Sequence, residues 1–236
     1  MSPDMPVSPS RCHALVPCAG VGSRSGAKGP KQYEMLGGQP LVWHTLHALS
    51  SVPDIHRILV VVSPGDDFIK NAPERVDTQA VGGASRAESV SNGLAALLAT
   101  GASADEWVLV HDAARCLVLP GDIQRLIDAC RGDAVGGLLA VPLADTLKQA
   151  SDGRSAQTLA RAGKWLAQTP QMFRIGALQA ALAPHAANGY EGITDEASAM
   201  ELAGHCPLLV EGGSHNLKVT YPQDFLVAKA LLEGRA

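Results

Sequence analysis

The sequence predicts an α/β fold with a mostly parallel, twisted sheet and helices on both of its faces. Short aliphatic or β-branched runs alternate with stretches of helical period, and glycine, proline or aspartate residues separate them. The run at 58–62, Ile-Leu-Val-Val-Val, shows no polar alternation, as in a strand that helices cover on both faces. We therefore expect this run to be a central strand.

The expected elements follow one another along almost the whole chain. Strands are expected at 14–16, 58–63, 78–81, 107–111, 134–142 and 207–211. Helices are indicated by apolar side chains at helical spacing, with a proline near the start or a glycine after the end. They are expected at 41–50, 86–100, 122–131 and 222–232.

The segment 145–173 interrupts this alternation. Its extended pieces at 146–149 and 157–160 are separated by Ser-Asp-Gly-Arg, which is a turn sequence. We expect a β-arm that projects from the main sheet, with a long surface loop as the alternative. Residues 1–10 contain three prolines and are expected to form a disordered tail, so that 11–236 form a single domain.

Composition excludes several classes of protein. The 236 residues are 46% hydrophobic and 18% charged, which is enough apolar material for a core and excludes a disordered chain. A net charge of −4 and an aromatic content of 4% argue against a nucleic-acid or anionic-membrane surface. Five cysteines without a C-x-x-C pair, and no apolar run of about 18 residues, lead us to expect a cytoplasmic protein without disulfides, signal peptide or membrane span.

A glycine-rich loop follows the first expected strand. Gly20 and Gly22 let the backbone approach a polyphosphate and turn its N–H groups toward the oxygens. The loop has neither the third glycine of a dinucleotide fingerprint nor the Gly-Lys-Ser/Thr of a Walker A motif. Arg24 and Lys31 favour nucleotidyl transfer, because charge builds up on the oxygens around an attacked phosphorus; alternatively they are solvated loop charges.

A second motif follows the strand expected at 107–111. Asp112 ends this strand and Arg115 lies three residues further on. Ligands of open α/β sheets gather beyond the carboxyl ends of the strands, so both side chains are expected near the glycine loop. A carboxylate there suits Mg²⁺, which makes Asp112 the candidate metal ligand; alternatively Asp112 caps the turn and pairs with Arg115.

Seven blocks of sequence, taken in order, carry a resemblance to a known family. They are 16–24 with 30–32, 82–83 with 86–90, 110–115, 145–148, 169–171, 194–197 and 216–219. Together they resemble the 2-C-methyl-D-erythritol 4-phosphate cytidylyltransferase family over almost all of the chain from Cys12 onward. The resemblance implies a Rossmann-like nucleotidyltransferase fold. It also implies transfer of CMP from CTP to 2-C-methyl-D-erythritol 4-phosphate in non-mevalonate isoprenoid biosynthesis, with Mg²⁺ or another divalent cation and a homodimer formed through the β-arm.

The resemblance implies roles for individual residues. Catalysis is assigned to Arg24, Lys31, Arg161 and Lys218. CTP binding is assigned to Pro17, Cys18, Ala19, Gly20, Gly22, Gly82, Gly83, Ser89 and Ala113. Binding of the sugar phosphate is assigned to Asp112, Arg115, Thr146, Arg161, Thr169, Thr194 and Lys218. Because Arg161 lies in the arm, which crosses to the neighbouring subunit in the family, one active site would draw on two chains.

Alternatives remain beside this assignment. The acceptor could be another polyol phosphate such as ribitol 5-phosphate, or the chain could be a non-catalytic nucleotide-binding protein. Cys18 stands where the family commonly has alanine and adds a thiol at the nucleotide. His215 is a further candidate metal ligand, whereas Asp195 and Glu196 indicate a helix start, where acidic side chains complement the helix dipole.

Overall fold

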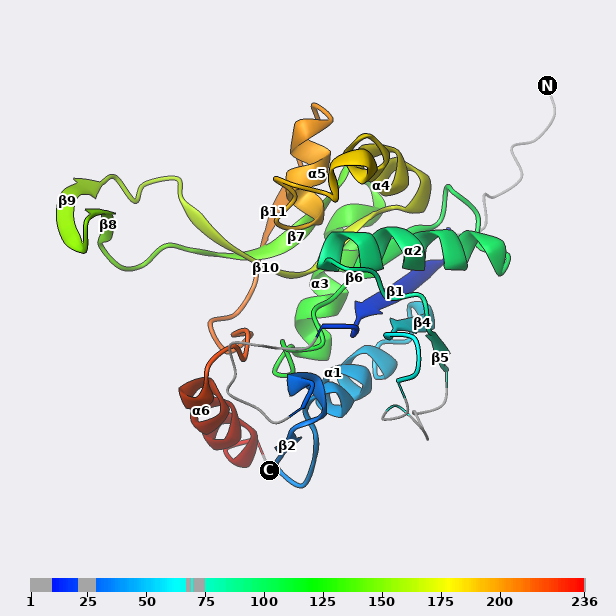
Figure 1. The fold of residues 1–236 in the computed structure, drawn as a ribbon, viewed down its shortest axis with the longest axis horizontal. Helices are drawn as coiled ribbons and strands as arrows, with labels where there is room; N and C mark the ends of the chain where they lie inside the picture. The colour runs from blue at the N-terminus through cyan, green and yellow to red at the C-terminus, as the bar shows by residue number, and fades with distance from the viewer. Residues whose placement is uncertain (1–9, 21–28, 67–68, 70–74, 236) are drawn as a thin grey trace.

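A seven-stranded sheet forms the centre of the computed structural model, which describes residues 10–20, 29–66, 69 and 75–235 (Figure 1). The strand order is β11-β7-β10-β6-β1-β4-β5, and β10 runs antiparallel to β6 and β7 whereas the other neighbours are parallel. The strands are β1 (Cys12–Pro17), β4 (Ile55–Val61), β5 (Val76–Gln79), β6 (Trp107–Val110), β7 (Gly136–Pro142), β10 (Trp165–Arg174) and β11 (Leu208–Glu211). The expected mostly parallel sheet is thereby confirmed.

Helices cover both faces of this sheet, as predicted. One face packs against α1 (Leu41–Ser50) and α3 (Pro120–Arg131). The other packs against α2 (Arg86–Ala99), α4 (Ile175–Leu182) and α5 (Glu196–Leu202). Successive side chains of β1 point to opposite faces, so that Val16 joins the first core cluster and Leu15 the second. The last helix, α6 (Pro222–Glu233), packs through Ala228 against a third cluster beside the start of α1.

The expected strands and helices begin and end within three residues of the observed ones. The strand expected from residue 134 begins only at Gly136, because the Asp133 carboxylate accepts hydrogen bonds from the backbone N–H groups of Val135 and Gly136. The helix start expected near Asp195 is confirmed: the Asp195 side chain accepts a hydrogen bond from Ser198 N and caps α5.

The arm is shorter than the expected range 145–173. Its hairpin consists of β8 (Leu147–Ser151) and β9 (Arg154–Leu159), joined by Asp152 and Gly153, both with positive φ. The rest of the range includes β10, a strand of the central sheet. Pro170 and three polar residues obscured this strand in the sequence, because a proline normally excludes a central strand. An irregularity in the pairing with β7 between Ala167 and Gln171 accommodates it.

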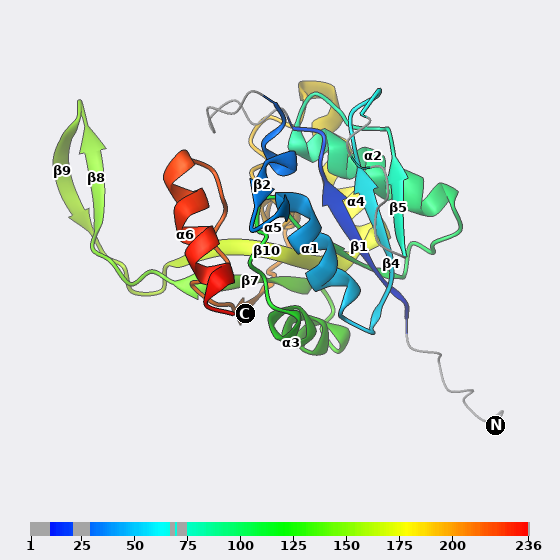
Figure 2. The same cartoon turned by 90° about the horizontal axis from the view of Figure 1, so that it is seen from below.

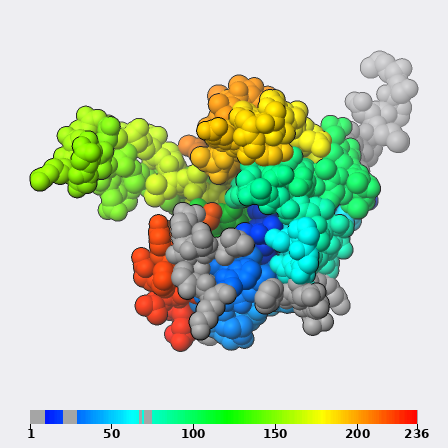
Figure 3. All heavy atoms as spheres, viewed as in Figure 1, coloured from blue at the N-terminus to red at the C-terminus, as the bar shows by residue number. Residues whose placement is uncertain are grey.

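The hairpin stands clear of the body of the molecule in both ribbon views and in the space-filling view (Figures 1, 2 and 3). Almost all of its residues are exposed, and its two strands pair only with each other.

Smaller elements of the structure were not predicted. They are the 3-10 turns η1 (Lys31–Tyr33) and η2 (Ala183–Asn188), the strands β2 (Met35–Leu36) and β3 (Gln39–Pro40), and the helix α4. Of the tail expected at 1–10, residues 1–9 lie outside the described part of the chain. Among the described helices, none has the length and apolar character needed to span a bilayer.

Candidate active site

A pocket of about 470 Å³ lies beyond the carboxyl ends of β1 and β6. The loop after β1, the residues after β6, the start of α2 and two lysines from elsewhere in the chain contribute to its wall. Ten of the residues that the sequence assigns to the site line it: Pro17, Cys18, Ala19, Gly20, Lys31, Gly83, Ser89, Asp112, Ala113 and Lys218. Of the other assigned residues, Gly22 and Arg24 lie outside the described residues.

The loop after β1 is held from behind by two side chains. The buried Gln32 amide donates hydrogen bonds to the carbonyl oxygens of Cys18 at 2.8 Å and Gly20 at 2.9 Å. Ser63 Oγ donates to the carbonyl oxygen of Ala19 at 3.0 Å. Three successive peptide groups that border the pocket are therefore fixed in orientation. The sequence assigned no role to Gln32, although it lies in the block 30–32 that carries part of the family resemblance.

A second backbone segment borders the pocket at Gly83, whereas the preceding Gly82 does not line it. A Cβ atom at Gly82 would overlap Ala19 Cβ, so the close approach of the two segments requires glycine. Gly83 N donates to Ser89 Oγ at 3.0 Å, and this hydroxyl donates to the carbonyl oxygen of Ser85 at 2.9 Å. Ser89 thus lines the pocket and also holds the glycine segment in place.

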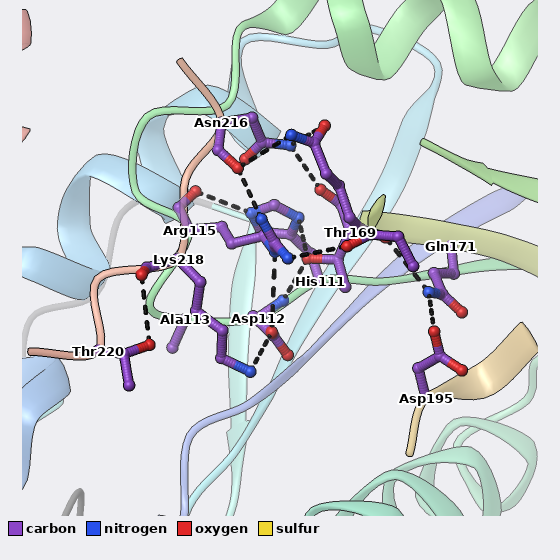
Figure 4. A network of polar contacts seen from close by, with 12 residues as sticks. His111, Asp112, Ala113, Arg115, Thr169, Gln171, Asp195, Asn216, Lys218 and Thr220 are labelled. Atoms are coloured by element: carbon purple, nitrogen blue, oxygen red, sulfur yellow. Dashed lines mark hydrogen bonds and ion pairs between the residues drawn. The ribbon is translucent and has the colours of Figure 1, made fainter. Parts of the chain in front are cut away.

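Charged side chains converge on Asp112, which is only 7% exposed. Arg86 Nε lies 2.7 Å from Asp112 Oδ1, and Lys218 Nζ lies 2.7 Å from Asp112 Oδ2. Figure 4 shows the Lys218 and Asp112 side chains pointing toward one another. Arg115 Nε is more distant, at 4.0 Å from Asp112 Oδ2. Each carboxylate oxygen therefore has its own close cation.

These neighbours set the protonation state of Asp112. Burial alone would raise the pKa of its carboxyl, but the charges of Arg86 and Lys218 outweigh burial and hold this pKa well below its ordinary value. Burial likewise opposes the charge of Arg86, yet Asp112 and Glu196 raise the pKa of its guanidinium. The wall of the pocket therefore contains an ionised carboxylate, Asp112, paired with the charged guanidinium of Arg86.

Arg86 and Glu196 are the main residues that the sequence assignment missed. Glu196 is 2% exposed, and its two oxygens accept hydrogen bonds from Arg86 Nη1 at 2.7 Å and Nη2 at 3.1 Å. Its place in the first turn of α5 agrees with the expected helix start, but its carboxylate pairs with an arginine as well. The block 86–90 contained Arg86, whereas no sequence signal linked it to a carboxylate 110 residues away.

Arg115 and Thr169 lie behind the pocket rather than in its wall. Arg115 donates to the carbonyl oxygens of Asn216 at 2.7 Å and Ala167 at 3.1 Å. Thr169 Oγ1 accepts a hydrogen bond from Asp112 N at 3.0 Å and lies 3.1 Å from His111 Nδ1 (Figure 4). Both side chains thus brace the segments that carry Asp112 and Lys218.

Three more of the assigned residues, Thr146, Arg161 and Thr194, do not line this chain's own pocket. Thr194 is exposed, and its hydroxyl is 3.5 Å from Asp195 Oδ1. Thr146 and Arg161 belong to the exposed arm segment, where the Arg161 guanidinium donates to the carbonyl oxygen of Ala144. Because the hairpin projects away from the body, the structure of one chain does not bring these two side chains to the pocket (Figure 1).

The described side chains do not form a prepared magnesium site. Both Asp112 oxygens are already paired with cations, and the described residues contain no cluster of three His, Cys, Asp or Glu side chains suited to a metal. His215, the other candidate ligand, lies 2.8 Å from Asp122 Oδ2 through its Nε2. The observed contacts of Asp112 instead suit the ordering of Arg86 and Lys218.

Known proteins are similar to this chain over almost its whole length. A 2-C-methyl-D-erythritol 4-phosphate cytidylyltransferase from Chromobacterium violaceum is 55% identical over 227 residues, covering 94% of this chain and 98% of the relative. A bifunctional enzyme IspD/IspF from Albidiferax ferrireducens is 57% identical over 96% of this chain, which spans 54% of that longer relative.

Two solved structures are similar to this chain in both fold and sequence. A crystal structure of 4-diphosphocytidyl-2C-methyl-D-erythritol synthase matches with a TM-score of 0.84 and 43% identity, covering 94% of this chain and 98% of that one. The Francisella tularensis 2-C-methyl-D-erythritol 4-phosphate cytidylyltransferase matches with a TM-score of 0.81 and 33% identity, covering 94% and 99%. The family model described as IspD, 2-C-methyl-D-erythritol 4-phosphate cytidylyltransferase, matches residues 12–234, and the chain therefore belongs to this family.

Proposed function

We propose that the chain transfers a CMP group from CTP to the phosphate of 2-C-methyl-D-erythritol 4-phosphate. The products are 4-diphosphocytidyl-2-C-methyl-D-erythritol and pyrophosphate, and the reaction belongs to non-mevalonate isoprenoid biosynthesis. The observation that carries the proposal is the meeting of the loop after β1 with Lys31, Asp112 and Lys218 in one pocket of a chain of this family.

The chemistry brings two anions together. A phosphate oxygen of the acceptor forms a bond to the α-phosphorus of CTP. The bond from that phosphorus to the oxygen bridging to the β-phosphate breaks, and its electron pair leaves on pyrophosphate. Lys31 lines the pocket beside the loop and would stabilise the charge on the α-phosphate and the leaving group, together with Arg24.

CTP would lie along the backbone that lines the pocket. Peptide groups at 17–20 and 82–83, with Ala113 and Ser89, offer groups for the base and the ribose, and the orientation of several of them is fixed by hydrogen bonds. The 4-amino group of cytosine needs acceptors that uracil would leave unpaired, at about 1–3 kcal/mol for each buried group. We therefore expect CTP to be preferred over UTP.

The acceptor phosphate would bind at Lys218. The Lys218 side chain is 40% exposed and lines the pocket, so its ammonium reaches solvent-accessible space while it pairs with Asp112. Arg115 and Thr169 support this position from behind through their contacts with the backbone around Asn216 and Asp112. The exposed Thr194, which does not line the pocket, would contribute a further hydroxyl to the acceptor.

The arm would complete the active site of a second subunit in a homodimer. An isolated two-stranded hairpin is at best marginally stable in water, so an exposed one that extends from the body calls for a partner surface. Arg161 and Thr146 are exposed on this arm segment and lie away from their own pocket. In the dimer they would hold the acceptor phosphate from the opposite side to Lys218.

Mg²⁺ would enter with the nucleotide rather than at a protein site of its own. The ion prefers phosphate oxygens and water together with one or two carboxylates, and Asp112 already has a cation at each oxygen. When bound, the ion neutralises charge on the phosphate oxygens.

Pyrophosphate release tests the proposed function. The purified protein is mixed with CTP and Mg²⁺, and either 2-C-methyl-D-erythritol 4-phosphate or ribitol 5-phosphate is added as acceptor; a parallel series uses UTP. We expect rapid release only with CTP and the methylerythritol phosphate. Release with ribitol 5-phosphate alone would instead identify a different polyol phosphate acceptor, and release with neither, despite CTP binding, would identify a nucleotide-binding protein.

A further inference from the structure

We propose that Glu196 is a positioning residue for the acceptor phosphate, acting through Arg86 on the ion pair between Asp112 and Lys218. The proposal rests on the proposed function in one respect, the assignment of the acceptor phosphate to Lys218. Glu196 itself does not line the pocket, so its effect must pass through residues that do.

Arg86 divides its hydrogen bonds between two carboxylates, Glu196 and Asp112. An arginine beside a carboxylate commonly pairs with both of its oxygens through two N–H groups. Here the two Nη atoms are directed to Glu196, at 2.7 and 3.1 Å, and Asp112 receives only Nε, at 2.7 Å from Oδ1. Glu196 thereby leaves Asp112 Oδ2 to Lys218, at 2.7 Å.

The arrangement of Arg86, Glu196 and Asp112 is held by three elements of the core. Arg86 is the first residue of α2, Glu196 is the first residue of α5, and Asp112 lies two residues after the end of β6. The Glu196 and Asp112 side chains are 2% and 8% exposed, so neither carboxylate is free to turn into solvent. The chain of contacts thus fixes the place of the Lys218 ammonium relative to three elements of the core.

Without the Glu196 carboxylate, the hydrogen bonds of Arg86 would be distributed differently. The Nη atoms of Arg86 would lose their partner, and the nearest carboxylate that Arg86 already contacts is Asp112. Arg86 would then pair with both Asp112 oxygens and displace Lys218 from Oδ2. A lysine side chain is flexible, so its ammonium would lose the fixed position that orients an attacking phosphate.

If Glu196 acted only through its charge, removing that charge would raise kcat/KM for the acceptor. If it acts by positioning Lys218, its removal should lower kcat/KM, so the two effects can be told apart. Removing an anion makes the surroundings of Lys218 more positive, and this alone would strengthen the binding of an anionic acceptor. Loss of positioning weakens the reaction instead. We expect Glu196→Gln to lower kcat/KM for the acceptor about tenfold while the Kd for CTP in the absence of acceptor changes less than about twofold.

A second variant separates the two effects further. Glu196→Asp keeps the charge but is one methylene too short to keep both contacts with Arg86, so we expect a similar loss of kcat/KM. The matched control is Glu201→Gln, an exposed position on the same helix, for which we expect wild-type kinetics. Each rate is divided by the concentration of CTP-binding sites measured for that variant. A loss of folded protein then does not appear as a lower kcat.

A double-mutant cycle with Asp112→Asn completes the test. If Glu196 acts through Asp112, Glu196→Gln will add no further loss once Asp112 is neutral. Full additivity, an increase of kcat/KM in Glu196→Gln, or kinetics like those of Glu201→Gln in a folded variant would overturn the proposal. Absence of CMP transfer by the wild-type protein would instead contradict the proposed function.

Discussion

The Gln32 side-chain amide lies 2.9 Å from the carbonyl oxygen of Gly20, to which it donates a hydrogen bond. The same nitrogen also donates to the carbonyl oxygen of Cys18, and Gln32 is only 6% exposed. The loop that is proposed to bind the triphosphate therefore takes its shape partly from a buried amide in the turn that also carries Lys31. Because Gln32 and Lys31 are neighbours in the turn η1, the shape of the loop after β1 and the position of the Lys31 ammonium depend on each other.

Gln32→Leu should therefore weaken CTP binding. Leucine is similar in size but cannot donate, so two carbonyl oxygens would lose a partner, and we expect the free energy of unfolding to fall by about 1–3 kcal/mol. Calorimetric titration with CTP should show about a tenfold higher Kd, because the loop is no longer held in its binding shape. The matched control is Gln223→Leu at an exposed position of α6, and unchanged CTP affinity in Gln32→Leu would contradict the role of the amide.

The Lys31→Ala substitution should lower turnover while the protein remains folded. Lys31 Nζ also donates to the carbonyl oxygen of Val219 at 2.6 Å, so the substitution removes a structural contact as well as a charge. We expect the fold and part of the CTP affinity to remain. The value of kcat should fall by about 10²–10³, because a preorganised charge at the reacting phosphorus is lost.

The measurement for Lys31 is steady-state pyrophosphate release, with circular dichroism to check the fold. Lys229→Ala removes a lysine from the exposed face of α6, where its nearest carboxylate is Glu233 at 3.8 Å, and should retain wild-type rates. Full activity of Lys31→Ala would refute the catalytic assignment.

The order of strands and helices could be predicted because it depends on local pattern. Apolar runs without alternation indicated β4 and β6, and helical spacing with a terminal glycine indicated α3. β10 could not be predicted, because its buried polar side chains have partners that the sequence does not display. Gln171, for example, donates to Asp195 Oδ2 at 2.9 Å and accepts from Ala197 N at 2.7 Å, which makes a polar residue compatible with a buried strand.

The same division holds for the site. The glycine loop and Asp112 were recognisable because each directly follows a predicted strand. Lys218 was recognisable because it lies in the block 216–219, which resembles the family. The pairing of Arg86 with Glu196 depends on the packing of α2 and α5 on one face of the sheet. This packing could not be predicted from a single sequence, so the pairing of Arg86 with Glu196 could not be predicted either.

Mixing two inactive variants tests whether the arm completes a partner's site. In the proposed dimer, Arg161 of one subunit serves the pocket that contains Lys31 of the other. Arg161→Ala and Lys31→Ala should each be nearly inactive. After subunit exchange, half of the dimers are mixed and one of their two sites is intact, so an equimolar mixture should regain about one quarter of wild-type activity.

Subunit exchange is verified by native mass spectrometry of differently tagged chains. Mixing Arg161→Ala with a second arm variant, Thr146→Ala, is the matched control. Every mixed dimer then pairs one altered arm with another, so no site is restored and activity should stay low. Verified exchange without recovery in the Arg161 and Lys31 mixture would contradict the shared site.

The thiol of Cys18 should be unreactive although it lines the nucleotide pocket. Burial raises the pKa of this thiol to about 12, and only the weak hydrogen bond with the Tyr33 hydroxyl, at 3.8 Å, acts in the opposite direction. The reactive thiolate forms only as the pH approaches the raised pKa, so at about pH 8 the group remains protonated. Iodoacetamide should therefore modify the exposed Cys206, whereas Cys18 stays unmodified and activity is retained. Peptide mass spectrometry after timed labelling measures both sites, and rapid alkylation of Cys18 with loss of CTP binding would show that the loop opens far more often than its hydrogen bonds to Gln32 suggest.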